Sequence, residues 1–172
     1  MKKLILSLVI GLTVVALLAA PAMAAGKTGQ AGNSNVGHLY LYEKDPDTWE
    51  IVEDGAWGKM KYNLSGETFD YVFNGHGLEP GCEYTLVYYP DPWPGEGLIC
   101  LGEGTANKGG NVHIKGSKNT GDLPMTGDDN YPDGAKIWLV LSEDVDCAEQ
   151  EMIGWTPCKY LFEYDLISYT SE

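Results

Sequence analysis

Short runs in which apolar and polar residues alternate cover most of the chain beyond residue 36. Nine such runs are rich in Tyr, Val, Ile and Trp, a composition typical of β-strands. They span residues 37–43, 49–52, 56–64, 68–73, 82–89, 98–104, 111–115, 135–142 and 160–169. Gly, Pro, Asn and Asp cluster between the runs and mark where each strand ends.

The alternation also predicts how the strands lie in their sheets. In 111–115, Val112 and Ile114 alternate with polar residues, which indicates one buried and one solvated face. Residues 135–142 are apolar on both faces, so we expect this strand at the centre of a sheet. The one helical candidate, 147–152, follows Asp146 as an N-cap. The pattern as a whole predicts an all-β protein, an antiparallel β-sandwich of immunoglobulin-like or jelly-roll-like type with about eight or nine strands.

The first 24 residues have the pattern of a signal peptide. Two lysines precede an apolar run over residues 4–20, Pro21 ends the run, and residues 22–24 read Ala-Met-Ala, the small-residue spacing of a cleavage site. An uncleaved membrane anchor is the alternative, since 17 apolar residues come near the length of a span. The expected organisation is a signal peptide (1–24), a flexible arm (25–36) and a single sandwich domain (37–172), in a protein that is secreted, extracellular or at the cell surface.

The charge balance excludes several classes of partner. The 11 basic residues are all lysines, because the chain has no arginine, and they are outnumbered by 25 acidic residues. Removal of Lys2 and Lys3 with the signal peptide leaves 9 lysines against 25 acids, a formal net charge of −16. Nucleic acid is therefore not expected as a partner, and an anionic membrane would repel the mature chain. Its many Tyr and Trp residues exclude a disordered acidic tail.

Four cysteines, Cys82, Cys100, Cys147 and Cys158, all follow the expected cleavage site. An even number in an exported chain predicts two disulfides. Three pairings are possible; we favour Cys147–Cys158, which closes a short loop, together with Cys82–Cys100. Free buried cysteines are the alternative, and a metal site is disfavoured because no C-x-x-C spacing occurs.

Five segments resemble a group of small secreted prokaryotic proteins, many of them archaeal, to which no function is assigned. The segments are 55–58 (GAWG), 73–81 (FNGHGLEPG), 84–95 (YTLVYYPDPWPG), 134–145 (GAKIWLVLSEDV) and 155–167 (WTPCKYLFEYDLI). The resemblance extends over nearly all of the mature chain. It implies export and a β-rich fold, and it transfers no catalytic residue.

Residues 88–97 form the most unusual segment. Three prolines in five residues stiffen it, with Trp93 at its centre and Tyr88 and Tyr89 at its base. A preorganised aromatic surface loses little entropy on binding and suits sugar rings or a protein partner. We therefore predict ligand contacts from Tyr88, Tyr89 and Trp93. The alternative is that Trp93 folds back over the end of the sandwich.

A second candidate site lies in residues 127–134. Asp128, Asp129, Asn130 and Asp133 provide the hard oxygen ligands that Ca²⁺ prefers, so calcium is a possible cofactor. The spacing departs from the EF-hand pattern and lacks its final Glu. An Asx-rich turn before a strand is the alternative, and it is the one we favour.

No catalytic motif is present. His38, His76 and His113 are the only histidines, and neither a G-x-S-x-G nor an H-E-x-x-H pattern occurs. A catalytic pair of carboxylates for glycoside cleavage is not excluded, since 25 acids provide many candidate pairs. We expect a non-catalytic protein with a binding or structural role at the cell surface, recognising carbohydrate or protein. The alternatives are an exported hydrolase with an unidentified carboxylate pair and a calcium-binding structural protein.

Overall fold

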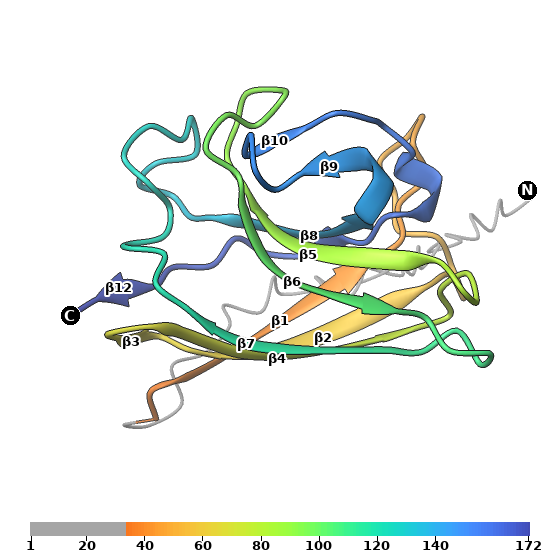
Figure 1. Ribbon diagram of the computed structural model, residues 1–172, viewed down its shortest axis with the longest axis horizontal. Helices are drawn as coiled ribbons and strands as arrows, with labels where there is room; N and C mark the ends of the chain where they lie inside the picture. The colour runs from red at the N-terminus through yellow and green to blue at the C-terminus, as the bar shows by residue number, and fades with distance from the viewer. Residues whose placement is uncertain (1–33) are drawn as a thin grey trace, which may run out of the picture.

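Two antiparallel sheets packed face to face form a β-sandwich (Figure 1). The computed structural model describes residues 34–172, so the expected signal peptide and most of the expected arm lie outside the described residues. One layer has the strand order β11-β1-β2-β4-β7, with β1 (Val36–Tyr42), β2 (Trp57–Asn63), β4 (Phe69–His76), β7 (Val112–Lys118) and β11 (Phe162–Glu163). The other has the order β6-β5-β8, with β5 (Glu83–Tyr89), β6 (Ile99–Thr105) and β8 (Lys136–Leu141).

The remaining elements are short. Two-residue strands form two small additional pairs, β9 (Val145–Asp146) with β10 (Glu151–Met152), and β3 (Ser65–Gly66) with β12 (Thr170–Ser171). Two single-turn 3₁₀ helices, η1 (Ser142–Asp144) and η2 (Pro157–Lys159), complete the set. Over residues 34–172, no helix has the length and apolarity needed to cross a membrane.

Alternation of side chains decides which face of each strand is buried. In β4, Phe69, Tyr71 and Phe73 point into the core and the residues between them are exposed. In β7, Val112 and Ile114 are buried while their neighbours are exposed, as the sequence predicted. Because successive side chains in a strand point to opposite faces, this alternation leaves a continuous solvated outer face on the five-stranded sheet.

The C-terminal segment closes one side of the sandwich. Leu161 bridges to Leu139 of β8, and Phe162 and Glu163 then pair with β1, so the segment joins one layer to the other. Further along, Ile167 bridges to Ala135. This segment shields the edge of β8 from solvent.

Several predicted elements differ from the structure. Residues 49–52 make one isolated bridge instead of a strand, and residues 160–169 form mainly bridges rather than one long strand. The strand at the centre of the three-stranded sheet is β5 and not β8. β8 is nevertheless apolar on both faces, because the C-terminal segment and the loop that follows β8 cover it. Residues 147–152 form a hairpin turn rather than a helix, in which Asp146 Oδ1 accepts from the N–H of Ala148 at 2.9 Å.

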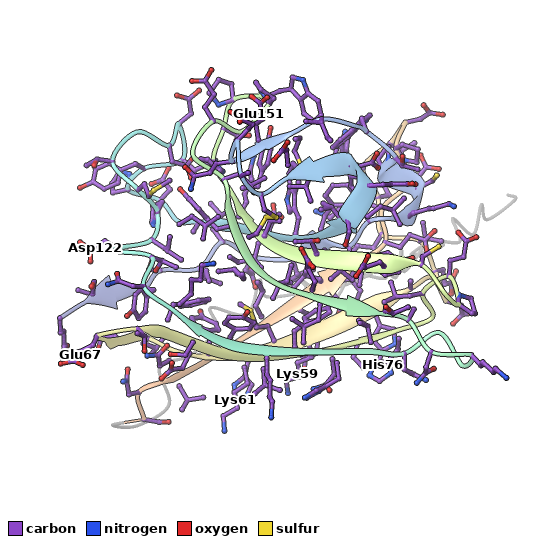
Figure 2. All side chains as sticks on the ribbon, viewed as in Figure 1. Lys59, Lys61, Glu67, His76, Asp122 and Glu151 are labelled. Carbon is purple, nitrogen blue, oxygen red and sulfur yellow. A yellow bond between two sulfur atoms is a disulfide. The ribbon has the colours of Figure 1, made fainter. Side chains whose placement is uncertain are left out.

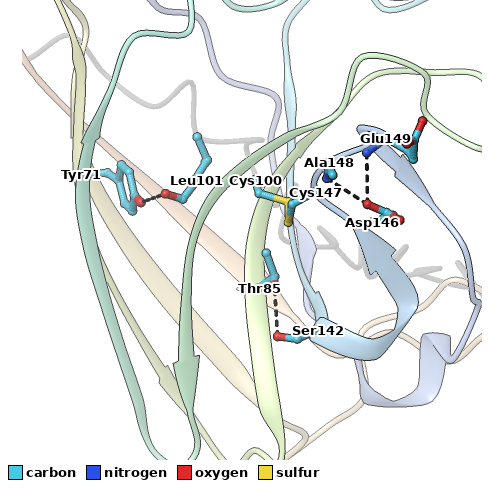
Figure 3. Close-up of a disulfide and its surroundings, with 9 residues drawn as sticks. All are labelled: Tyr71, Thr85, Cys100, Leu101, Ser142, Asp146, Cys147, Ala148 and Glu149. Atoms are coloured by element: carbon cyan, nitrogen blue, oxygen red, sulfur yellow. Dashed lines mark hydrogen bonds between the residues drawn. A yellow bond between two sulfur atoms is a disulfide. The ribbon is translucent and has the colours of Figure 1, made fainter.

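The predicted disulfide pairing is wrong. Cys100 on β6 is bonded to Cys147, and within the described chain Cys82 and Cys158 are both unpaired (Figure 3). The bond fastens the loop after β8 to the outer side of the β5–β6 pair. The short loop from Cys147 to Cys158 that favoured their pairing is instead occupied by the β9–β10 hairpin and η2. The pairing of the cysteines is therefore decided by the arrangement of the strands and not by the separation of the cysteines in the sequence.

Candidate functional site

A pocket of about 490 Å³ opens beside β8, and aromatic side chains form most of its wall. Its lining residues are Trp49, Tyr89, Asp91, Trp93, Lys136, Trp138 and Trp155. Three of the tryptophans are unusually accessible, with exposed fractions of 49% for Trp49, 51% for Trp93 and 45% for Trp155. Large aromatic rings are normally buried, so half-exposed indoles gathered around one hollow mark a candidate binding site.

The floor of the pocket is a stacked pair of rings from neighbouring strands. Tyr89 of β5 and Trp138 of β8 lie 3.9 Å apart between ring centroids, with an interplanar angle of 11°. Gly95 makes this arrangement possible, because a Cβ there would lie 2.5 Å from the Tyr89 ring, and its φ of +81° favours glycine. The two strands therefore provide the rings of the floor, and Gly95 in the loop above leaves room for them.

Trp155 lies at the centre of the aromatic cluster. Its ring meets Trp93 edge-to-face at 5.5 Å, Trp138 at 6.1 Å and Tyr160 at 5.6 Å. The backbone before it is held by Asp144, whose carbonyl accepts from the N–H of Gly154 at 3.1 Å. The position of Trp155 is thus set by packing and by backbone hydrogen bonds.

A buried tyrosine–aspartate pair supports the Trp155 loop. The Tyr160 hydroxyl donates to Asp144 Oδ2 at 2.6 Å and accepts from the N–H of Thr156 at 3.0 Å. Burial raises the pKa of Tyr160, and the adjacent carboxylate raises it further. The hydroxyl therefore stays protonated and continues to donate at physiological pH.

Trp49 reaches the pocket from a tight turn between β1 and β2. Asp45 Oδ1 accepts from the backbone N–H groups of Asp47 and Thr48 at 3.0 and 2.9 Å, and these bonds lower the pKa of Asp45. Trp49 then takes a φ of +59°, which is rare for a bulky residue, and its ring packs edge-to-face on Phe162 at 5.0 Å. Backbone strain of this kind is typical of functional positions.

Two charged side chains provide the polar part of the rim. Lys136 of β8 forms an ion pair with Asp91 Oδ2, and the same oxygen accepts from the Asn130 amide at 2.8 Å. The N–H of Asp91 donates to Asp128 Oδ1 at 3.2 Å. Asp91 thus stands at the end of a hydrogen-bonded network that joins the loop after β5 to the loop before β8.

A second tyrosine–aspartate pair supports this side of the pocket. The Tyr88 hydroxyl donates to Asp128 Oδ2 at 2.6 Å and accepts from the N–H of Met125 at 3.1 Å. Burial and the contact with Asp128 both raise the pKa of Tyr88. This pair anchors Asp91 in the same way that Tyr160 and Asp144 anchor Trp155.

Unpaired polar atoms lie in the region of the pocket floor. Trp138 Nε1 and Glu163 Oε2 are both buried without a hydrogen-bond partner. Burial raises the pKa of Glu163, while Lys44 and Lys136 act in the opposite direction. Trp138 lies close enough to lower the pKa of Glu163 as well, and its ring is held by stacking on Tyr89.

The structure separates the three residues predicted to contact a ligand. Trp93 is exposed on the pocket, and Tyr89 forms its floor although only 2% of its surface is accessible. Tyr88 is fully buried and is not among the residues that line the pocket. Tyr88 and Tyr89 point to opposite faces of β5, and only the face of Tyr89 opens on the pocket.

Sequence reasoning missed five lining residues, Trp49, Asp91, Lys136, Trp138 and Trp155. The richness in tryptophan was a visible signal, since four of the five tryptophans of the chain line this pocket. Their positions follow no period, however, so no pattern along the chain connects them. Only the pairing of β5 with β8 and the return of the C-terminal segment bring them together.

The predicted calcium ligands lie in different surroundings. Asp128 is buried and its two oxygens accept hydrogen bonds from Tyr88, Asp91 and Asn130. Asp129 and Asp133 are exposed on the loop. In the part of the chain that the structure describes, no group of three or more His, Cys, Asp or Glu side chains is arranged to hold a metal.

Comparisons with protein-family models, curated proteins and solved structures found no match to this chain. The resemblance to small secreted prokaryotic proteins therefore stays a prediction.

Proposed function

We propose that this protein is an exported, non-catalytic carbohydrate-binding protein that takes a sugar residue into the aromatic pocket. The observation that carries the proposal is the group of three half-exposed tryptophans, Trp49, Trp93 and Trp155, around one hollow. Sugar rings present apolar C–H faces that pack on aromatic rings, while their hydroxyls seek polar partners.

The pocket offers both kinds of contact. Trp93 and Trp155 provide walls set at 80° to one another, and the stacked Tyr89–Trp138 pair provides the floor. At the rim, the Asp91 carboxylate and the Lys136 ammonium are an acceptor and a donor for sugar hydroxyls. The lining is held in place before binding, which lowers the entropy lost when a ligand is ordered.

Two observations support export. The first residues have the pattern of a signal peptide, and the Cys100–Cys147 bond is of a kind that persists in oxidising compartments. A location outside the cell places the pocket where glycans are abundant.

The hydrolase alternative has less support at this pocket. Glycoside cleavage uses two carboxyl groups on either side of the scissile bond. Asp91 is the single carboxylate among the lining residues, and it is already paired with Lys136. Binding without turnover is therefore the function that these residues support best.

The proposal is tested by screening the purified protein on a glycan array, followed by calorimetric titration of the strongest ligand. We expect Trp93→Ala to weaken binding at least tenfold, about 1.4 kcal/mol, because tryptophans in pockets carry much of the binding energy. Tyr131→Ala is the matched control, since Tyr131 is 51% exposed, as Trp93 is, but lies outside the pocket lining.

Three outcomes would overturn the proposal. They are the absence of any bound glycan, an equal loss of affinity in Tyr131→Ala, and release of reducing sugar from a bound glycan. The last would favour the hydrolase alternative. Melting temperatures of both variants show whether a loss of binding reflects the pocket or the fold, and Trp155→Phe tests a second wall with less disturbance of packing.

A further inference from the structure

The outer face of the five-stranded sheet has a composition unlike that of the rest of the protein. Its outward positions on β1, β2, β4 and β7 carry three lysines and all three histidines of the chain. These are His38, Lys59, Lys61, His76, His113 and Lys115. Asp70 is the one carboxylate at an outward position of these four strands, although the chain has 25 acidic residues.

Strand register arranges these side chains in rows across the sheet. One row runs His38–Lys61–Val72–Lys115 over four adjacent strands. Since neighbouring strands lie about 4.8 Å apart, Lys61 and Lys115 are separated by about 10 Å. Figure 2 shows Lys59 and Lys61 pointing away from the sandwich on the layer opposite Glu151.

None of the three lysines of this face forms a salt bridge within residues 34–172. Among residues 34–172, the two lysines found in salt bridges are Lys136 and Lys159, and neither belongs to this face. Lys59 lies 5.2 Å above the ring of Tyr40, a cation–π contact that leaves its charge in place. The face is therefore a local region of positive charge on an acidic protein.

A shallow hollow of about 630 Å³ lies on this face, and its lining includes two lysines, Lys61 and Lys115, and one carboxylate, Asp70. Val36 and Val72 contribute apolar surface, while Asn63 and Ser117 offer polar groups. Exposed aromatic rings stand beside the lysines in the next rows, Tyr40 at 38% and Trp57 at 40% accessibility. The surface thus combines cations, apolar patches and rings on a flat sheet.

We propose that this face binds an anionic polysaccharide, as a second binding surface beyond the aromatic pocket. Charge complementarity requires an acidic partner, and two lysines about 10 Å apart in one row, with Lys59 in the next, suit a polymer with repeated charges. Exposed Tyr40 and Trp57 add stacking surfaces for sugar rings. The absence of arginine disfavours nucleic acid, whose phosphates arginine recognises best.

The test measures binding of the purified protein to immobilised polygalacturonate, with dextran as the neutral polymer and polyglutamate as the acidic polypeptide. We expect binding to polygalacturonate alone, weakening as salt rises from 50 to 300 mM because exposed charges are screened. The variant Lys61→Glu/Lys115→Glu is expected to lose at least tenfold in affinity. Among the single variants, Lys115→Glu is expected to lose several-fold, whereas Lys108→Glu, with the same change of charge in an exposed loop, stays within twofold.

Each contrary result overturns the proposal. Absence of binding to polygalacturonate at 50 mM salt would do so, as would equal losses in Lys108→Glu and Lys115→Glu, which would show that net charge alone matters. Equal binding of polyglutamate would identify the face as a surface for an acidic protein instead. Trp93→Ala is expected to leave polygalacturonate binding unchanged, so failure of this proposal and failure of the proposed function are separable.

Discussion

At the scale of single residues, the acidic side chains of this protein act in two different ways. Most are exposed, and they make the chain acidic without forming a site. Asp128 and Asp144 are buried, and each accepts a short hydrogen bond from a buried tyrosine. A buried carboxylate is stable only where donors surround it, and here those donors belong to the loops that carry the pocket residues.

Asp128→Ala is predicted to lower the free energy of unfolding by about 2–3 kcal/mol, because it leaves the Tyr88 hydroxyl and the N–H of Asn130 without their acceptor. Urea denaturation measures the change. Asp129→Ala, at an exposed position of the same loop, is expected to change stability by less than about 0.5 kcal/mol.

The same pair of variants tests calcium binding. Both oxygens of Asp128 are already hydrogen-bonded, so millimolar CaCl₂ is expected to leave the melting temperature of the wild-type protein unchanged. A rise in melting temperature with calcium that disappears in Asp128→Ala would contradict this, since a ligand that binds only the folded state must stabilise it.

At the scale of elements, the loop from β8 to β10 is the part that depends most on a covalent link. It contains two-residue strands, a single-turn helix and a hairpin, none of which has enough hydrogen bonds to be stable alone. Figure 3 shows how Cys147 joins this loop to Cys100 on β6, and the Ser142 and Thr85 hydroxyls meet nearby at 2.8 Å. The loop continues into Trp155, so the disulfide also supports one wall of the pocket.

Replacement of both bonded cysteines, Cys100→Ser/Cys147→Ser, is predicted to destabilise the protein by about 4 kcal/mol, the chain-entropy value for a link across 47 residues. Urea denaturation of the oxidised protein gives the measurement. Cys158→Ser serves as the control, because Cys158 is exposed and unpaired in the structure, and a change below about 0.5 kcal/mol is expected.

Thiol labelling of the denatured, unreduced protein checks the pairing directly. Two free thiols per chain are expected, from Cys82 and Cys158. A count of zero, or a large loss of stability in Cys158→Ser, would show that a second bond forms between these two cysteines.

At the scale of the whole molecule, tyrosine dominates the packed interior. Tyr62, Tyr71 and Tyr89 are buried in three different strands, and burial is the main cause that raises the pKa of each to about 12. A tyrosine in the unfolded chain loses its proton near pH 10. The folded state therefore holds protons that the unfolded state releases between about pH 10 and 12.

Stability is consequently predicted to be complete below pH 10 and to fall as the pH rises from 10 through 12. Circular dichroism and the absorbance of tyrosinate, followed together, are expected to change in one cooperative step. Tyr62→Phe removes one buried hydroxyl and is expected to move the unfolding midpoint to higher pH. Tyr131→Phe, with Tyr131 at 51% exposure, is expected to leave it in place. Ionisation of all tyrosines without loss of the β signal would contradict the prediction.

Much of the fold could be predicted from the sequence because the relevant signal is local. In β1, β2, β4, β5, β6 and β7, alternating residues and the turns between them placed the strands within a few positions of their observed bounds. The prediction failed at residues 49–52, where an Asx turn at Asp45 competes with extended backbone. It also failed at residues 160–169, whose apolar residues serve as bridges between layers rather than as one strand.

The candidate site could be predicted only in part. The proline-rich loop directed attention to Trp93, which does line the pocket. The prediction assigned both Tyr88 and Tyr89 to the ligand, although adjacent residues of a strand point to opposite faces and only one face opens on the hollow. Which face opens depends on what covers each face, and the covering segments come from residues 143–162.

By itself, the sequence determined the β-rich class, the solvated face of β7, the acidic balance and the number of cysteines, because each follows from composition or from a period of two. The tertiary structure alone decided the Cys100–Cys147 pairing, the convergence of four tryptophans and the basic rows of the outer face. These features join residues far apart in the chain. Their neighbours are set by the hydrogen-bond register between strands, which no local pattern encodes.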